Sequence, residues 1–477
     1  MLKKLNRKNA SSEKTRAVKI LQFGEGNFLR AFVDWMVDIL NEKTDFNAAV
    51  EVVQPIAKGM AKELNVQDGL YHVVLKGIQQ GEIFSETRLI SCVTHAINPY
   101  EEFPTFLKAA ENPELKFIVS NTTESGIAFN TSDSNPNALA ETFPGKVTQL
   151  LFHRFKFFNG DHDKGLILLP CELIEKNGET LKKAIVDYVD LWKLPAAFMQ
   201  WIHEANIFCN TLVDRIVPGF PRDTIQQIQD TIGYEDNLVV QAEPFHLWVI
   251  EGPAAVQQHL PTAKAGLDVK FVTDLTPYRT RKVRILNGAH TTLVPVAYLA
   301  GFRTVKDSID DNAIGAYIRS VITEEIIPTL DLPAEELKKF AHDVIERFQN
   351  PFIKHELLSI ALNSISKYKV RVLPSVLEYH KRTGKLPSNL LYAMAALIRF
   401  YKGEWQGNII PLNDAPEILD FFKTVWQKQN KDEIAQNVLA NESFWGQDLN
   451  KVKGLHEMVS KALKQIESGV KVLAPES

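Results

Sequence analysis

Val18-Lys-Ile-Leu-Gln-Phe23 leads directly into Gly24-Glu-Gly-Asn-Phe-Leu-Arg30, and the expected architecture follows outward from this junction. The first run is short and mostly apolar and ends at a glycine, as a buried strand does. Residues 28–40 then show the pattern of a helix. A strand that passes into a helix through G-x-G predicts the opening unit of an α/β sheet, with free helix N–H groups at the turn.

The alternation of strand and helix continues to about residue 275. Residues 48–53 are expected to form the second strand, and several later runs are almost entirely Val, Ile and Leu, as in parallel strands buried on both faces. Further strands are predicted at 71–75, 87–93, 117–119, 166–169, 207–213, 238–240 and 269–272. This pattern favours a Rossmann-type, doubly wound α/β domain over residues 1–276.

Beyond residue 277 the strand signals fade and helical periodicity dominates. Prolines separate the helical segments, as they do at helix starts and stops. Helices are predicted at 282–299, 309–325, 333–348, 357–367, 389–401, 415–428 and 452–468. The sequence therefore predicts a mostly α-helical second domain over residues 277–477, with the boundary near 274–277.

Composition excludes several classes of protein. The chain has 477 residues and a net charge of −4, which is unlike the basic face of a nucleic-acid binder but compatible with a small anionic substrate. No apolar run approaches the roughly 18 residues of a membrane helix, and residues 1–16 lack the apolar core of a secretory signal. Cys92, Cys171 and Cys209 form no C-x-x-C pair, and His203-Glu204 lacks a second histidine for zinc. A cytoplasmic protein without a metal site, nucleic-acid partner or membrane partner is expected.

The glycine loop fits the pyrophosphate of a dinucleotide. Gly24 permits a tight turn, and Gly26 lets the backbone approach phosphates without a Cβ. The third glycine of the usual fingerprint is Leu29, and the second strand ends at Gln54 rather than at an acid. Gln54 can hydrogen-bond a ribose and Lys58 can instead meet a 2′-phosphate, so the choice between NAD and NADP stays open at this point. The alternative is a glycine turn that merely joins a strand to a helix.

Lys282, Asn287 and His290 form K-x4-N-x2-H on the first helix of the second domain. At about 100° per residue, Asn287 and His290 share one face, and Lys282 lies about 80° from His290 and about 140° from Asn287. Oxidation of an alcohol requires removal of its hydroxyl proton, and a lysine with cationic neighbours such as Arg281 and Arg284 is a suitable base. The alternative is a solvated lysine and a core histidine.

Several motifs together resemble the polyol-specific long-chain dehydrogenases, the mannitol dehydrogenase family. The resemblance implies a Rossmann-type first domain, a helical second domain, a lysine general base and no catalytic metal. It extends from about Leu21 to the helices near Pro374, which is most of the chain. The motifs are Phe23-Gly-Glu-Gly-Asn-Phe-Leu-Arg-Ala31, Ser120-Asn-Thr-Thr-Glu-Ser-Gly126, Asn177-Gly178, Val213-Asp-Arg-Ile-Val-Pro218, residues 244–251 and residues 282–290.

The same resemblance implies a role for individual residues. The general base falls on Lys282, the two oxygen-polarising asparagines on Asn177 and Asn287, and the substrate-contacting histidine on His290. The aspartate of the V-D-R-I-x-P motif falls on Asp214, which is expected to contact substrate. Cofactor contacts are expected at Phe23, Gly24, Gly26, Asn27, Phe28, Gln54, Asn121 and Thr122.

One departure from the family pattern concerns the substrate. Mannitol-type members have an arginine eight residues before a lysine, and here that pair is Ser359 and Lys367. The sequences of residues 121–127 and 169–178 are most similar to those of the hexuronate branch of this family, whose substrates carry a carboxylate. Lys367 and Arg284 are therefore expected to bind substrate. Arg284, Lys354, His355, Lys367, Lys369 and Arg371 are all candidates to hold the carboxylate.

These observations predict reversible hydride transfer between NAD and a secondary alcohol of a sugar acid. A different sugar acid or a neutral polyol such as mannitol is an alternative substrate. A nucleotide-binding sensor without catalysis is the alternative from another class.

Overall fold

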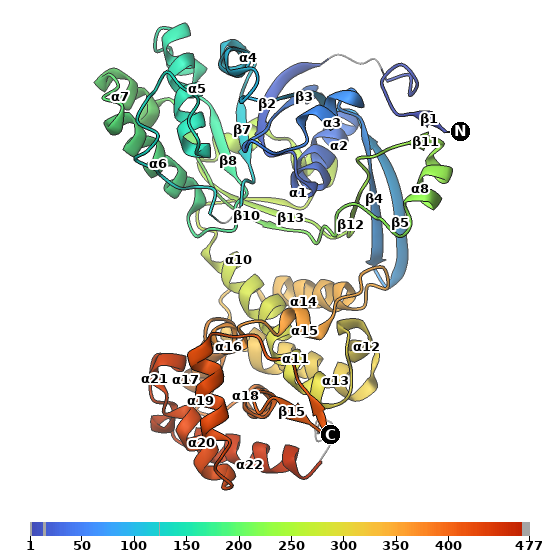
Figure 1. Ribbon diagram of the computed structural model, residues 1–477, viewed down its shortest axis with the longest axis vertical. Helices are drawn as coiled ribbons and strands as arrows, with labels where there is room; N and C mark the ends of the chain where they lie inside the picture. The colour runs from blue at the N-terminus through green and yellow to red at the C-terminus, as the bar shows by residue number, and fades with distance from the viewer. Residues whose placement is uncertain (1, 13–15, 124, 470–477) are drawn as a thin grey trace. The chain divides into compact units, whose positions relative to one another are not determined.

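The computed structural model describes residues 2–12, 16–123 and 125–469 of the chain (Figure 1). Two compact units can be distinguished: Met1–Lys76 with Ile83–Leu275, and Gly77–Glu82 with Thr276–Ser477. The short segment Gly77–Glu82 groups with the helical unit, where the Glu346 carboxylate accepts the backbone N–H groups of Gln80 and Gly81 at 3.3 and 2.6 Å.

A six-stranded, wholly parallel sheet forms the centre of the first unit. The chain starts at β2 in the middle, builds outward to one edge through β3 and β6, and then crosses to the other side. This is the order of a doubly wound Rossmann sheet, so the predicted fold class is confirmed. The strands, in spatial order, are β6 (Val93–Ile97), β3 (Ala48–Val53), β2 (Ala17–Phe23), β7 (Phe117–Ser120), β8 (Ile167–Pro170) and β9 (Ile207–Phe208).

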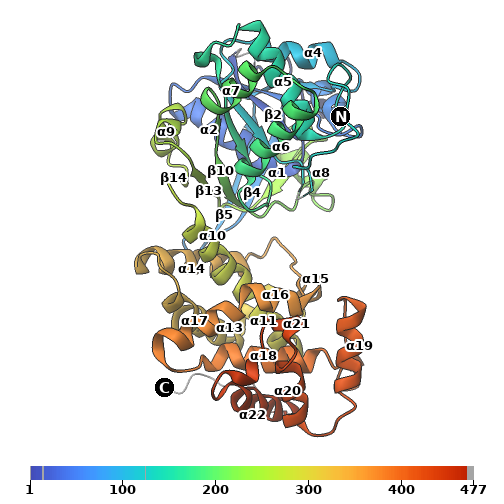
Figure 2. The same ribbon diagram turned by 90° about the vertical axis from the view of Figure 1, so that its left-hand side faces the viewer.

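Both faces of this sheet are buried. Phe117 and Val119 of β7 belong to one apolar core, and Ile118 between them belongs to the other. This two-residue alternation explains the continuous apolar runs in the sequence. Figures 1 and 2 show one set of helices together on one side of the sheet. That set is α5 (Phe143–Phe157), α6 (Asn177–Leu191) and α7 (Ala196–Glu204), while α1 (Asn27–Leu29), a π-helical turn (Arg30–Asp34) and α2 (Trp35–Lys43) cover the other side.

Two predicted strands are each divided in the structure. The run 87–93 breaks at Ser91, whose N–H and hydroxyl bond the Asp38 carboxylate at 3.0 and 3.1 Å. The run 207–213 breaks at Cys209, and the next residue, Asn210, caps α6 with its side chain by accepting from Gly178 N and Glu179 N at 3.1 Å each. The longer strands outside the parallel sheet are β4 (Tyr71–Gln79), β5 (Glu82–Ile90), β10 (Asn210–Asp214), β12 (Val240–Ala242), β13 (Leu247–Glu251) and β14 (Val269–Val272).

Helices make up almost all of the second unit. Its central helix α11 (Gly288–Leu299) is buried along its whole length, which matches its nearly uninterrupted apolar sequence. The helices that surround it include α13 (Asn312–Ser320), α14 (Ala334–Phe348), α15 (Leu357–Ile360), α16 (Ser364–Arg371), α17 (Leu373–Thr383), α18 (Ser388–Phe400) and α22 (Leu455–Glu467). Among the described residues, no helix combines the length and apolar character needed to span a membrane.

The predicted helix 357–367 is in fact two helices. The break lies at Asn363, which adopts a left-handed conformation with φ 52°, a conformation that asparagine tolerates better than most residues. Its backbone N–H donates to Asn413 O at 3.0 Å and so leaves the helical pattern. The break redirects the chain, so that Lys367 and Arg371 lie on a separate helix, α16.

Candidate active site

The turn after β2 requires its first glycine. Gly24 has φ 121°, and a Cβ there would lie 3.0 Å from the carbonyl oxygen of Asn121. Gly24 N donates to Val53 O at 3.0 Å, which ties the turn to the end of the neighbouring strand. Gly26 and Asn27 are exposed, and nothing lies within 4 Å of a Cβ placed on Gly26. The turn therefore leaves an open backbone surface at the start of a helix, as a pyrophosphate needs.

Buried polar side chains hydrogen-bond to the backbone of this glycine turn and to one another. Gln22 Nε2 donates to Gly24 O at 3.1 Å and to the Asp34 carboxylate at 3.3 Å. The Tyr71 hydroxyl donates to the same carboxylate at 2.7 Å. Complete burial raises the pKa of Asp34 to about 7, so its proton is held up to neutral pH. Arg30, which the sequence analysis did not single out, donates to Glu25 O at 3.0 Å and to Asn27 Oδ1 at 2.8 Å.

The loop after β3 is closed by two side chains. Gln54 is buried, and its amide donates to Ile56 O and Ala57 O at 2.8 and 3.2 Å. The Glu25 carboxylate accepts Met60 N at 3.1 Å, and burial raises its pKa. Both hydrogens of the Gln54 amide are used within the loop, so the predicted ribose contact stays a prediction for the amide oxygen, which also accepts Ala61 N at 3.3 Å. Lys58 is exposed on the same loop.

The end of β7 supplies the second side of the predicted cofactor site. Thr122 is fixed by Glu172, whose carboxylate accepts its N–H at 2.9 Å and its hydroxyl at 3.0 Å. Asn121 N donates to Phe23 O at 3.1 Å. The Phe23 ring itself is buried against Phe106 and Phe143. Phe23 therefore offers only its backbone to the loop, and a cofactor contact at this residue is expected through the backbone.

Phe28 is half-buried and stacks on Phe32 with 4.9 Å between ring centroids. The predicted cofactor residues other than Gln54 thus gather at the carboxyl ends of β2 and β7. These are adjacent strands from which the chain proceeds in opposite directions, and such a switch point is where open α/β sheets bind ligands.

Asn177 has a different role from the predicted one. It is fully buried, and its amide nitrogen donates to Pro170 O, Glu172 O and Thr211 O at 2.9, 3.0 and 3.1 Å. Its amide oxygen accepts Thr211 N at 2.8 Å and Gly178 N at 3.0 Å. An amide with all its hydrogens engaged cannot donate to a substrate oxygen, so Asn177 acts as a clamp between β8, α6 and β10.

Gly178 allows this clamp to form. A Cβ at Gly178 would lie 2.2 Å from Cys209 O, so only glycine permits this approach of α6 to the sheet. Asp214 is buried at the end of β10, where it pairs with Leu247 of β13. Its neighbour Arg215 donates to Ala31 O at 2.7 Å and stacks over the Trp35 ring. Burial lowers the pKa of Arg215 to about 9.

Lys282 and Asn287 lie on a π-helical turn, Lys282–Asn287, that continues directly into α11 and His290. Because a π turn bonds residues five apart, it holds more residues per turn than an α-helix and brings Lys282 and Asn287 closer to one face than the predicted ~140°. Both side chains are half-buried. Within the described residues the Asn287 amide has no hydrogen-bond partner, in contrast to Asn177. The arrangement leaves Asn287 available to a ligand.

The two predicted cationic neighbours of Lys282 have partners on other helices. Arg281 is buried, donates to the Glu336 carboxylate at 2.7 Å and lies over the Phe340 ring. Arg284 donates to the Ser375 hydroxyl at 3.1 Å. Burial lowers the pKa of Arg284, and the charge of Glu378 on α17 opposes that effect. The Arg284 guanidinium is thus hydrogen-bonded to a residue of α17.

His290 is 9% exposed and packed by aromatic rings. Phe348 stacks on it, and His355 meets it edge-on with 5.1 Å between centroids. Its buried Nε2 has no hydrogen-bond partner among the described residues. Burial, followed by the charges of His355, Arg347, Arg371 and Lys367, lowers its pKa well below the usual value, so the ring is neutral. A neutral imidazole with a free nitrogen can orient a substrate hydroxyl.

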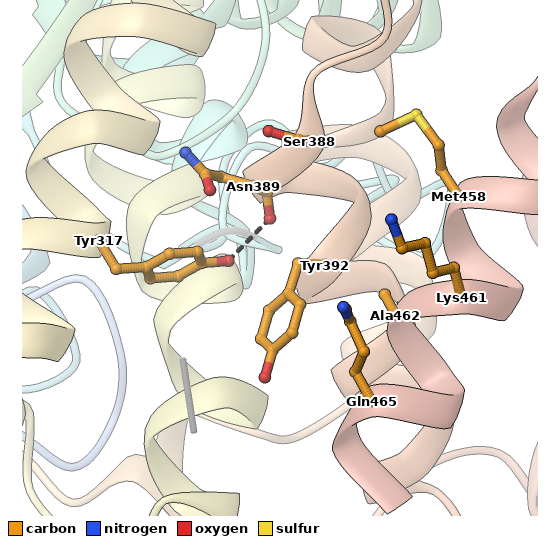
Figure 3. Close-up of a pocket in the computed structure, with 8 residues that line it drawn as sticks. All are labelled: Tyr317, Ser388, Asn389, Tyr392, Met458, Lys461, Ala462 and Gln465. Atoms are coloured by element: carbon orange, nitrogen blue, oxygen red, sulfur yellow. Dashed lines mark hydrogen bonds between the residues drawn. The ribbon is translucent and has the colours of Figure 1, made fainter. Parts of the chain in front are cut away.

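A separate hollow of about 190 Å³ lies elsewhere in the helical unit, between α13, α18 and α22 (Figure 3). Tyr317, Tyr392 and Lys461 are among its lining residues, and the Tyr317 hydroxyl donates to Asn389 O at 2.8 Å. None of the site residues predicted from the sequence lines it.

A Rossmann sheet with a glycine turn, together with a helical unit that presents lysine, asparagine and histidine on one helix, is the organisation of an oxidoreductase. Residues 18–264 match the mannitol dehydrogenase Rossmann domain, and residues 274–467 match the mannitol dehydrogenase C-terminal domain. The chain belongs to the mannitol dehydrogenase family.

Relatives and solved structures agree with this assignment. Altronate oxidoreductases from Phocaeicola vulgatus and Bacteroides thetaiotaomicron are each 51% identical over 469 residues, covering 98% of both chains. That of Bacillus subtilis is 49% identical over 450 residues, covering 94% of this chain and 92% of its own. A substrate-free D-sorbitol dehydrogenase matches 98% of this chain and 99% of its own, with TM-score 0.82 and 23% identity. Mannitol 2-dehydrogenase from Pseudomonas fluorescens, solved with NAD and D-mannitol, covers 98% and 97%, with TM-score 0.68 and 21% identity. The last two show the fold alone.

Proposed function

We propose that the protein is an altronate oxidoreductase, which interconverts altronate and tagaturonate with NAD as the redox partner. The single observation that carries the reaction type is the placement of Lys282, Asn287 and His290 on one continuous helix. The substrate is inferred from the 51% identity to altronate oxidoreductases over nearly the whole chain.

The residues at the glycine turn fit a dinucleotide. The positive φ of Gly24, the open space at Gly26 and the exposed Asn27 leave backbone N–H groups accessible to a pyrophosphate. The Glu25 carboxylate closes the neighbouring loop and disfavours a 2′-phosphate by charge, which favours NAD over NADP. When bound, the nicotinamide supplies or accepts the hydride.

The chain's own residues handle the proton and the oxygen. During reduction, Lys282 gives a proton to the oxygen of the keto group, and during oxidation it removes the same proton from the hydroxyl. Asn287, whose amide is free within the described residues, donates to that oxygen as charge develops on it. The neutral His290 orients an adjacent hydroxyl. Asn177 positions the ends of β8 and β10 through the bonds that its side-chain amide donates to Pro170 O and Thr211 O.

The test is the oxidation of NADH, followed by absorbance, with tagaturonate, fructuronate and fructose as substrates. The expected result is preferential turnover of tagaturonate and a loss of about 10²–10⁴-fold in Lys282→Ala. Lys338→Ala is the matched control, because Lys338 is an exposed lysine of α14 that pairs with Glu335.

Each other outcome has a distinct meaning. Preference for fructuronate or fructose would assign a sibling substrate, and unchanged activity of Lys282→Ala would place the base elsewhere. NADH binding without turnover of any of the three substrates would favour a nucleotide-binding sensor and overturn the proposal.

A further inference from the structure

Arg371 is a partly buried arginine with no protein partner. It is the last residue of α16, and within the described residues its guanidinium makes no ion pair and no hydrogen bond. Burial lowers its pKa, and no neighbouring carboxylate opposes that effect. The unbonded guanidinium nitrogens still reach solvent, so their N–H donors are open to an incoming anion.

Lys367 lies one helical turn earlier on the same face of α16. Its ammonium donates to Ile360 O at 2.8 Å and is half-buried. Two like charges four residues apart repel one another, and accordingly the pKa of Lys367 is lowered by burial and then by Arg371. The negative charge of Asp414 partly offsets this lowering of the Lys367 pKa. Arg371 therefore carries the uncompensated charge of the pair.

This cationic end of α16 lies beside the candidate site. A Cβ on Gly288, two residues before His290, would lie 3.2 Å from Arg371 O, so α16 ends directly against the start of α11. His355 adds a second imidazole at the edge of His290. The unpartnered Nε2 of His290 and the unpaired guanidinium of Arg371 are independent signs that this place accepts a polar ligand.

We propose that Arg371 binds the carboxylate of the sugar-acid substrate, with Lys367 adding positive charge, and thereby selects hexuronates over neutral sugars. A planar guanidinium matches a carboxylate with two parallel hydrogen bonds. The proposal rests on the proposed function, since it assumes a sugar-acid substrate.

The other candidate cations are less suitable. Arg284 is occupied by Ser375, and Lys354 is exposed and paired with Glu356 at 2.7 Å. Lys369 lies on the other side of α16, where its side chain is 3.5 Å from a Cβ placed on Gly446. Lys369 is therefore a matched control, because it carries the same charge on the same helix but points elsewhere.

The first experiment compares kcat/KM for tagaturonate and for fructose, a neutral ketose, in Arg371→Gln, Arg371→Lys and Lys369→Gln. We expect Arg371→Gln to lose about 10²–10³-fold with tagaturonate, mainly through KM, and to change less than about threefold with fructose. Arg371→Lys should recover part of the loss, and Lys369→Gln should behave as the wild type. An equal loss on both substrates, or no loss with tagaturonate, would overturn the proposal.

A second measurement does not depend on turnover. Calorimetric binding of altronate and of altritol, its neutral alditol, is measured with the wild type and with Arg371→Gln. Selective loss of altronate binding supports the subsite even if tagaturonate is not the substrate that is turned over. Wild-type binding that does not distinguish altronate from altritol would overturn it. Thermal melting of each variant verifies that the loss is not due to unfolding.

Discussion

The imidazole of His290 lies almost parallel to the ring of Phe348, with 4.1 Å between the centroids and 22° between the planes. The two residues belong to α11 and to the last turn of α14, so the packing of two helices determines the orientation of the histidine. The buried Nε2 has no partner in the described part of the chain to hold it in place. Ring packing, rather than hydrogen bonding, is therefore what positions His290.

The first prediction concerns this packing. Phe348→Leu removes the stacked ring while keeping an apolar side chain, so it should cost about 1–3 kcal/mol of stability and lower kcat/KM by about tenfold. Phe421→Leu is the control, because Phe421 packs edge-on against Phe444 with 4.9 Å between centroids. Steady-state kinetics and thermal melts of both variants separate the effects. Equal activity in the two variants would show that Phe348 does not orient His290.

The second prediction distinguishes the two asparagines. Asn177→Ala removes a donor from three buried carbonyls, of which Pro170 O keeps the Thr211 hydroxyl, and should lower the free energy of unfolding by about 2–4 kcal/mol. Asn287→Ala should leave stability nearly unchanged but lower kcat by about 10²–10³-fold, because its amide is free for the reacting oxygen. Urea unfolding and kinetics on the folded variants provide the comparison. A stable Asn177→Ala with low kcat would restore the role first predicted for Asn177.

The contrast between these residues shows what the sequence could and could not predict. Lys282, Asn287 and His290 could be grouped because their relation depends on spacing along one helix, although the π turn changed the angles. The role of Asn177 could not be inferred, because its partner Thr211 lies 34 residues away and is brought close only by the sheet. The parallel sheet was predictable because burial on both faces leaves continuous apolar runs.

The position of Arg371 beside His290 could not be predicted from the sequence either. The sequence around Asn363 has the pattern of one continuous helix. Only the left-handed backbone of Asn363 interrupts that helix and lets α16 begin as a new one. Which cation lies beside His290 depends on how α16 packs on α11, and spacing along the chain does not encode that contact. The sequence therefore predicted a set of cations, and our proposal of Arg371 among them rests on tertiary contacts.

The third prediction compares the two glycines of the turn. Gly24→Ala must adopt φ 121° and places a Cβ 3.0 Å from Asn121 O, so it should lose roughly 1–3 kcal/mol of stability together with NADH affinity. Gly26→Ala meets open space in the protein and should melt like the wild type, yet bind NADH at least about tenfold more weakly. Fluorescence titration with NADH and thermal melts check both. Unchanged NADH affinity in Gly26→Ala would place the pyrophosphate elsewhere.

The fourth prediction follows from the protonation of Asp34. Its pKa is about 7 in the folded protein because of burial, against an ordinary value of 3.8, so the folded state holds this proton when the unfolded chain has lost it. Its contribution to stability is therefore fully present below about pH 4 and is lost as pH rises toward 7. The slope is about 1.4 kcal/mol per pH unit for one proton, which gives roughly 2–3 kcal/mol between pH 5 and pH 8.

Asp34→Asn keeps an acceptor for the Tyr71 hydroxyl and cannot ionise, so that decline should disappear. The measurement is urea unfolding of wild type and variant at pH 5 and pH 8, with Asp223→Asn, an exposed acid of the same unit, as the control. Only the difference between the proteins is interpreted, because other groups titrate equally in each. Parallel pH dependence of wild type and Asp34→Asn would mean that Asp34 is already ionised in the folded protein at pH 5. The Gln22–Asp34–Tyr71 network would then support the glycine turn as a buried anion rather than as a neutral acid.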